Sequence, residues 1–184
     1  LSYAVEFLTE DEIVSQYGKE GITGYHLQDG LARISDSTQM TLFTANGLLV
    51  GQTRGCLRGI MGPYTDYVAQ AYQEWYKTQV CDFPATEDFH TCWLLHIPGL
   101  YVRHAPGTIC MEAIADGAAG SIERPINNSK GCGGVMRVAS VGLYLGSSQM
   151  AGLATDLVAA DVAALTHGHE LGYIPAAMLS HMVR

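Results

Sequence analysis

Residues 63–75 read Pro-Tyr-Thr-Asp-Tyr-Val-Ala-Gln-Ala-Tyr-Gln-Glu-Trp, and this stretch decides the fold class. Its apolar side chains recur at helical spacing, at positions 64, 67, 68, 71, 72 and 75. That period places a single apolar face along an amphipathic helix. An aromatic stripe can also serve as a surface for stacking nucleic-acid bases, but a face turned toward a hydrophobic core is the commoner cause. We therefore predict a helix that begins at Pro63 and packs on a core.

Toward the N-terminus, Thr9 and Glu12 have the spacing of a capping box, which predicts a short helix ending near Gly18. Residues 19–34 contain several glycines and no clean period, so we predict a long loop there. No alternating pair of segments joined by a tight Asn-Gly or Asp-Gly turn is evident, and we therefore predict no β-hairpin. The organisation predicted for the whole chain is mostly helical.

Further helices are predicted on both sides of the opening stretch. The apolar residues between Met40 and Val50 indicate a largely buried helix that ends near Gly51. Residues 81–106 are irregular and contain several prolines. The remaining predicted helices lie at 108–117, with Thr108 as a cap, at about 133–145, at 150–166 and at 175–183, with Pro175 in a first turn. The sequence thus predicts an all-α protein with a single domain over residues 1–184.

The composition excludes several classes of protein. Of 184 residues, 48% are hydrophobic and 15% charged, which indicates a packed globular chain rather than a disordered one. The net charge of −8, without a Lys/Arg-rich run, argues against a nucleic-acid partner. No apolar run is long enough to span a membrane. The five cysteines form no Cys-x-x-Cys pair, which predicts reduced thiols and a cytoplasmic location.

A first candidate site is the stretch Ile34-Ser35-Asp36-Ser37-Thr38-Gln39-Met40. It places hydroxyls and a carboxylate where a loop becomes a helix. Mg²⁺ takes oxygen ligands of this kind, few in number and rigidly held. The alternative is an ordinary helix start, in which Ser35 or Asp36 caps the first backbone N–H groups. The residues alone leave both interpretations open.

A second candidate is the glycine-rich segment from Asn127 to Arg137, which contains three glycines within residues 131–134. Glycine lets the backbone approach a ligand closely. Backbone N–H groups at a helix start can hold a phosphate, and Ser129 can add a hydroxyl. The segment has neither the Walker A pattern nor a dinucleotide-binding fingerprint. A tight structural turn is the alternative.

Two further segments carry groups capable of acid–base or ligand chemistry. His167, His169 and Glu170 look like zinc ligands, but a two-residue spacing does not place both histidines on one helix face. The alternatives are a helix end capped by Gly168, or a single histidine that touches a ligand. Glu6 lies in an apolar segment and is a catalytic acid or base, a metal-linked residue, or a charge at a helix end.

Cys132 offers another kind of chemistry. It lies in the glycine-rich segment, and the fold can bring His167 near it. A thiolate at a helix N-terminus has a lowered pKa and is a nucleophile. No sequence signature of a cysteine protease surrounds it, so this alternative has the least support.

Taken in order, these segments resemble the ADP-ribosylglycohydrolase family, which includes the dinitrogenase reductase-activating glycohydrolases. Val5-Glu6-Phe7 is similar to the end of the family's Gly-Asp-Ala-Leu-Gly-x-x-x-Glu-Phe opening, and residues 35–38 to its Thr/Ser-Asp-Asp-Thr metal motif. Residues 128–137 are similar to its glycine-rich phosphate loop ending in Met-Arg. Thr166-His167 with residues 171–173 resembles its ribose-side histidine segment. Residues 103–107 also match a family segment, without an assigned role.

The resemblance implies a compact orthogonal helical domain that cleaves the N- or O-glycosidic bond joining ADP-ribose to a protein side chain or small acceptor. It implies two Mg²⁺ ions, and ADP-ribose or an ADP-ribosylated protein as partner. By resemblance, Glu6 is the catalytic carboxylate and the metal ligands are Ser35, Asp36 and Ser37. The substrate-binding residues that the resemblance implies are Ser129, Gly131, Cys132, Gly133, Gly134, Met136 and His167.

The chain departs from the family pattern in three places. Position 37 is Ser where the family has Asp, the opening Gly-Asp is absent, and the second metal motif, Asp-x-Asp-Thr, does not follow His167 before Arg184. We therefore expect one Mg²⁺ ion or none, in an incomplete piece of a longer polypeptide or in a member without metal-dependent turnover. The alternatives are a module that binds ADP-ribose without cleaving it and an assembly protein. Uncovered helix faces also predict self-association into a homo-oligomer.

Overall fold

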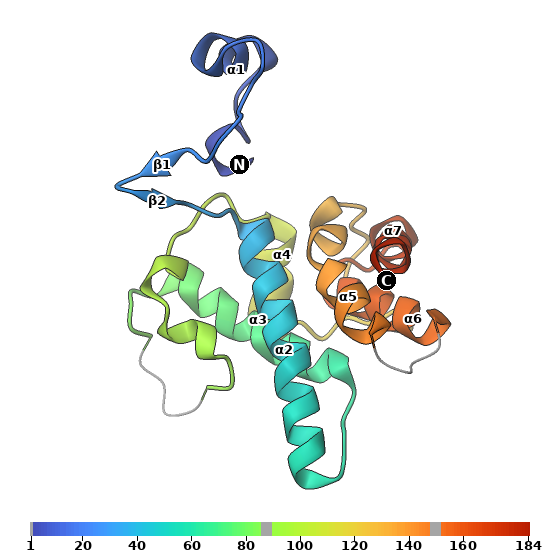
Figure 1. Ribbon diagram of the computed structural model, residues 1–184. Coiled ribbons are helices and arrows are strands. Elements are labelled where there is room, and N and C mark those ends of the chain that lie inside the picture. The colour runs from blue at the N-terminus through green and yellow to red at the C-terminus, as the bar shows by residue number, and fades with distance from the viewer. Residues whose placement is uncertain (1, 86–89, 148–151) are drawn as a thin grey trace.

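The structure is a computed structural model that describes residues 2–85, 90–147 and 152–184. Its fold is all-α, as predicted, and Figure 1 shows the arrangement of its helices. The α-helices are α1 (Glu10–Tyr17), α2 (Asp36–Arg58), α3 (Tyr64–Val80), α4 (Thr108–Ala115), α5 (Ala139–Gly146), α6 (Gly152–Ala164) and α7 (Glu170–Val183). Shorter elements are the 3-10 helices η1 (Ser2–Ala4), η2 (Trp93–His96), η3 (Pro98–Leu100) and η4 (Cys132–Arg137), and the strands β1 (Leu27–Gln28) and β2 (Leu31–Ala32).

Helix α2 runs through the middle of the molecule and packs against α3 and α5, while α4 packs on α3. Helices α5, α6 and α7 lie together on one side of α2 (Figure 1). Helix α3 begins directly after Pro63, as predicted. The apolar stripe of α3 faces the core, where Val68, Ala71, Tyr72 and Trp75 are completely buried. The rings of Tyr72 and Trp75 are therefore part of the core and not a surface for base stacking.

Helix α2 is longer than predicted, because it continues through Gly51 to Arg58 and ends at Gly59, whose φ is +70°. Gly47 and Gly51 face α3. A Cβ atom on Gly47 would lie 2.8 Å from Val68 Cα, and one on Gly51 would lie 2.7 Å from Tyr67 Cδ2. The prediction of an end near Gly51 was wrong because these glycines allow two helices to approach each other.

This close approach gives a stability prediction. Gly47→Ala is expected to lower the free energy of unfolding by about 1–3 kcal/mol, because the new methyl group meets backbone atoms that cannot move aside. Alanine has the higher helix propensity, so propensity alone predicts the opposite sign. Gly55→Ala is the matched control, because its Cβ meets only the side chain of Met61, at 3.1 Å or more. Urea unfolding of both variants separates the two effects, and equal changes would contradict the packing argument.

Residues near the N-terminus project from the helical core (Figure 1). The capping box is confirmed: the Glu12 N–H donates to Thr9 Oγ1 at 3.4 Å, and the Thr9 N–H donates to Glu12 Oε2 at 2.8 Å. Helix α1 ends at Gly18, as predicted, and buries none of its residues. Strands β1 and β2 pair antiparallel around Asp29 and Gly30, both with positive φ. The prediction of no hairpin was wrong: Asp29-Gly30 is an Asp-Gly turn, but the two-residue strands beside it are too short to show an alternating pattern.

The helix predicted at about 133–145 is two elements, η4 and α5, which are separated at Val138. Helix α4 begins at Thr108, but Gly107 occupies the cap position and no side chain caps the helix, so the prediction for Thr108 was wrong. Helix α6 lies within the predicted range of 150–166, and residues 150 and 151 lie outside the described residues.

Helix α7 begins at Glu170, five residues before the predicted start, and Pro175 therefore lies inside the helix rather than in its first turn. The earlier start arises because His169 caps the helix, its Nδ1 accepting the Leu171 N–H at 3.0 Å. In the part of the chain that the structure describes, no helix is both long and apolar enough to cross a membrane. The single domain and the self-association stay predictions.

Candidate functional site

Four of the sequence segments singled out above meet around one cavity of about 460 Å³, which we call the glycine-loop pocket. They come from the N-terminal segment, the first turn of α2, the segment with η4, and the turn after α6, and residues 105–110 complete the wall. Its lining residues are Glu6, Asp36, Ser37, Ala105, Gly107, Thr108, Ile109, Cys110, Ser129, Gly131, Cys132, Gly133, Met136 and His167.

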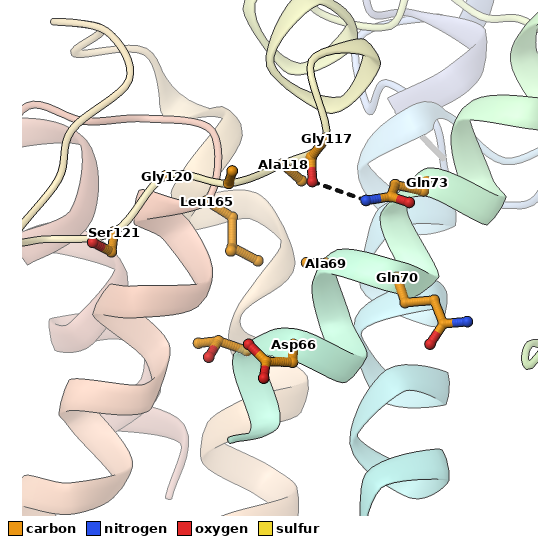
Figure 2. A pocket seen from close by; sticks show the side chains of 11 residues that line it. Asp66, Ala69, Gln70, Gln73, Gly117, Ala118, Gly120, Ser121 and Leu165 are labelled. Carbon is orange, nitrogen blue, oxygen red and sulfur yellow. Dashed lines mark hydrogen bonds between the residues drawn. The ribbon is translucent and has the colours of Figure 1, made fainter. Parts of the chain in front are cut away.

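A larger cavity of about 590 Å³ lies between α3 and residues 117–121 (Figure 2). Gln73 Nε2 donates to the Gly117 carbonyl at 2.9 Å across one side of it. Its lining includes one carboxylate, from Asp66, but no histidine or cysteine and no residue of the predicted site. Residue types capable of acid–base chemistry are therefore concentrated in the smaller cavity.

Asp36 lies in the first turn of α2 and is only 6% exposed. Burial raises the pKa of its carboxyl group, and the neighbouring Glu6 adds to this, while hydrogen bonds from the backbone of Ser37 and Gly107 and the nearby His104 oppose it. Ser35 occupies the cap position without a side-chain capping bond. Ser35 is buried and is not among the residues that line the pocket, so only Asp36 and Ser37 of the predicted metal ligands reach it.

The start of α2 is fastened to η4 by side-chain contacts. Ser37 Oγ donates to the sulfur atom of Met136 at 3.1 Å. Thr41 Oγ1 lies 2.8 Å from the Ser37 carbonyl oxygen and 3.1 Å from the Met136 carbonyl oxygen. These contacts hold the first turn of α2 and the glycine-rich segment together, although about 100 residues separate Ser37 from Met136 in the sequence.

Glu6 reaches the pocket from the N-terminal segment, with its side chain 33% exposed. Its Oε2 lies 3.2 Å from His104 Nε2. The His104 ring stacks on Tyr3 with 3.8 Å between ring centroids, and Phe7 lies 5.7 Å away on the same basis. His104 could not be given a role from the sequence, in which only the match of residues 103–107 to a family segment pointed to it. The N-terminal segment therefore surrounds this histidine and places Glu6 at the pocket.

The glycine-rich segment wraps around His167. A Cβ atom on Gly131 would lie 3.3 Å from His167 Nε2, and one on Gly133 would lie 2.7 Å from His167 Cε1 and 2.8 Å from Cys110 Sγ. Gly134 instead faces Ala163 and the Gly172 carbonyl, and it does not line the pocket. Glycine at 133 is therefore needed to leave room beside the imidazole, and a side chain at 131 would crowd it.

Asn127 fixes the glycine-rich segment to the turn that carries His167. Its Nδ2 donates to the Thr166 carbonyl at 2.8 Å, and its Oδ1 accepts the backbone N–H groups of Gly168 at 3.0 Å and Ser129 at 3.1 Å. A Cβ on Gly168 would lie 2.3 Å from the Asn127 carbonyl oxygen. Gly168 thus permits close approach of this segment, and it does not serve as the positive-φ end of a helix.

His167 is 2% exposed, and its Nδ1 lies 2.8 Å from Thr166 Oγ1. Burial, with a smaller contribution from the charge of Arg137, lowers its pKa to about 4, so the imidazole is neutral at physiological pH. His169 caps α7 and does not reach the pocket. Within residues 2–85, 90–147 and 152–184, no group of three or more His, Cys, Asp or Glu side chains could hold a metal ion. The zinc interpretation is therefore not supported.

Arg137 contacts Cys110 of the pocket wall, is completely buried, and was not singled out from the sequence. Its Nη2 donates to Thr166 Oγ1 at 2.7 Å and to the Val162 carbonyl at 3.1 Å. Its guanidinium lies 4.5 Å from the centroid of the Tyr72 ring, a cation–π distance. These partners fix the end of α6 and the turn that follows it.

All five cysteines are free. Cys132 is exposed and lines the glycine-loop pocket with His167, as the cysteine-nucleophile alternative requires. Cys110 lines the same pocket but is buried, and burial raises the pKa of its thiol. Because His167 is neutral with a low pKa, it offers no positive charge to stabilise a thiolate at Cys132.

Comparison with known proteins gave one finding. A family model described as ADP-ribosylglycohydrolase matches residues 1–184, the whole chain. Neither curated proteins nor solved structures gave a match.

Proposed function

The chain belongs to the ADP-ribosylglycohydrolase family, and from this we propose that the glycine-loop pocket binds ADP-ribose and hydrolyses the bond between its ribose and a protein side chain or small acceptor. The observation that supports this is the pocket itself, where Glu6, Asp36, Gly133 and His167 line one cavity although they come from four separate segments. Residues of this kind, converging on a concave site, mark a candidate active site.

The lining of the pocket suits a nucleoside diphosphate in size and chemistry. A volume of about 460 Å³ lies within the range of small-molecule sites. Gly131 and Gly133 line the pocket without a side chain, which lets a ligand approach their backbone closely. Ser129 and His167 add a hydroxyl and an imidazole beside these glycines. A chain with a net charge of −8 needs such local donors to hold an anion.

In this proposal Glu6 acts as the general base and takes a proton from the water that attacks the anomeric carbon of the ribose. Its partial exposure leaves room for that water, and His104 at 3.2 Å restricts the directions in which the carboxylate can point. The bond to the acceptor breaks as the new carbon–oxygen bond forms, and Glu6 returns the proton that it took from the water to the departing acceptor.

The proposal includes one Mg²⁺ ion, where the family resemblance implies two. Mg²⁺ usually binds through one or two carboxylates and keeps several waters. The residues at the pocket fit one such ion rather than two, held by the Asp36 carboxylate and the Ser37 hydroxyl. When bound, the ion would supply charge that polarises a ribose oxygen and acidifies a water.

A second candidate function is binding of ADP-ribose without cleavage. It is favoured by the lack, among the described residues, of any group of three or more metal-binding side chains, and by Ser37, whose hydroxyl donates to the Met136 sulfur. In this alternative the glycine-rich segment and His167 hold the ligand and Glu6 has no chemical role.

Isothermal titration of ADP-ribose with and without Mg²⁺, followed by chromatography of ADP-ribosylated peptides after incubation with the chain, distinguishes these functions. Mg²⁺-dependent release of ADP-ribose, lost in Glu6→Gln, supports hydrolysis. Binding without release supports the second candidate. No binding in either condition contradicts both.

Protection of a thiol tests where the ligand binds. With iodoacetamide, we expect Cys132, Cys56 and Cys81 to be labelled, because all three are exposed. Saturating ADP-ribose is expected to slow labelling of Cys132 by tenfold or more, because only this exposed thiol lines the pocket. Peptide mass spectrometry reports each site, and Cys56 and Cys81 are internal controls. Equal labelling of Cys132 with and without a ligand that binds would place that ligand elsewhere.

A further inference from the structure

Arg137, Thr166 and His167 form a continuous line of polar contacts that ends at the glycine-loop pocket. Arg137 Nη2 lies 2.7 Å from Thr166 Oγ1, which in turn lies 2.8 Å from His167 Nδ1. The three residues are 0%, 0% and 2% exposed, so Thr166 Oγ1 meets Arg137 and His167 in this line rather than bulk water. The positions of the hydrogen atoms along this line follow from the chemistry of each group.

A guanidinium only donates hydrogen bonds, so Thr166 Oγ1 accepts from Arg137. The hydroxyl has a single hydrogen left to donate. Its strongest nearby acceptor is His167 Nδ1, since the other neighbouring group, the Cys110 thiol, is a weak acceptor. If Nδ1 accepts the hydroxyl hydrogen, the neutral imidazole must carry its own hydrogen on Nε2.

The other ring nitrogen, Nε2, lies beside Gly131 and Gly133, which line the pocket. The position of a Cβ on Gly131 lies 3.3 Å from His167 Nε2 and 3.4 Å from Ser129 Oγ, so an atom at this point would be near both groups. Burial and the charge of Arg137 keep the pKa of His167 near 4, so the charged form does not compete at neutral pH. This corner of the pocket therefore presents an N–H group.

We propose that Thr166 is a positioning residue that, held by Arg137, fixes His167 in the Nε2–H tautomer and makes this corner of the pocket select an oxygen acceptor of the ligand, such as a ribose hydroxyl or a phosphate. A ligand that offers only a hydrogen-bond donor there would place it against the His167 N–H, and neither donor would have an acceptor. The tautomer is a property of the free protein, whereas its effect on the ligand rests on the proposed function.

Two-bond ¹H–¹⁵N correlation spectra of the ¹⁵N-labelled chain at pH 7 test the proposal, with His167→Gln used to assign the signals. We expect His167 Nδ1 to show a pyridine-type shift and Nε2 a pyrrole-type shift. Thr166→Ser keeps the hydroxyl and is expected to keep this pattern. Thr166→Val removes the hydroxyl with little change of shape and is expected to give mixed tautomers or the Nδ1–H form.

A pyrrole-type Nδ1 in the wild-type chain would overturn the proposal, and so would an unchanged pattern in folded Thr166→Val. If Thr166→Val does not fold, the wild-type and Thr166→Ser spectra still decide. Titration with ADP-ribose forms a separate arm, in which folded Thr166→Val is expected to bind about tenfold more weakly than Thr166→Ser. Absence of ADP-ribose binding by wild type would refute the proposed function while leaving the tautomer result intact.

Discussion

Gly133→Val is expected to abolish ADP-ribose binding in the glycine-loop pocket. Even a single Cβ at this position would lie 2.7 Å from His167 Cε1 and 2.8 Å from Cys110 Sγ. Valine adds two further methyl groups, so the imidazole must move or the new side chain must occupy the space left for the ligand. We expect titration calorimetry to show a loss in affinity of a hundredfold or more, which corresponds to about 2.7 kcal/mol.

Gly99→Val is the matched control, because a Cβ at Gly99 meets no atom within 4 Å. It is expected to bind ADP-ribose as the wild type does. Circular dichroism of both variants separates loss of the pocket from loss of the fold, since overpacking at Gly133 also costs about 1–3 kcal/mol of stability. Folded Gly133→Val that binds with unchanged affinity would place ADP-ribose outside this pocket.

The contrast between Gly133 and Gly51 shows what the sequence can reveal about glycine. The glycines at 131–134 lie close together beside a serine and a lysine, and this cluster indicated a loop that approaches a ligand. Gly51 lies singly in an apolar run and was predicted as a helix end, although α2 continues past it. A helix terminator and a site of close helix packing have the same local sequence, and only the partner, here Tyr67 of α3, distinguishes them.

The residues of the candidate site also differ in how well the sequence predicts them. Glu6, Asp36 and His167 could be predicted because their residue types are unusual in apolar or loop segments and because they match the motifs of one family. Ser35 and Gly134 belong to the same motifs but lie behind the pocket wall, because neighbouring residues in a chain point in different directions. Motif membership thus predicts the segment that reaches a site more reliably than it predicts each side chain.

His104 and Arg137 could not be given roles from the sequence, because their roles depend on residues far from them. His104 contacts Glu6 and stacks on Tyr3, and both residues lie about 100 positions away in the sequence. An arginine is usually exposed, so nothing in the local sequence indicates that Arg137 is completely buried. Long-range contacts of this kind require the packed fold, which a single sequence does not reveal.

Arg137→Ala is expected to lower the free energy of unfolding by about 3–5 kcal/mol, a large part of the stability of an ordinary domain. The substitution removes the donor to Thr166 Oγ1 and to the Val162 carbonyl, and these buried acceptors would then lack their partner. It also leaves a cavity beside Tyr72, over which the guanidinium lies. Urea unfolding monitored by circular dichroism measures the loss.

Arg124→Ala is the control, because Arg124 is exposed, and its effect is expected to stay within about 0.5 kcal/mol. Arg137→Met separates the two causes of the loss, since methionine restores much of the volume but none of the hydrogen bonds. If packing dominates, Arg137→Met recovers most of the stability, as replacement of buried charges by apolar residues does in some proteins. If the hydrogen bonds dominate, the free energy of unfolding of Arg137→Met stays close to that of Arg137→Ala. An effect of Arg137→Ala no larger than that of Arg124→Ala would contradict the complete burial of this arginine.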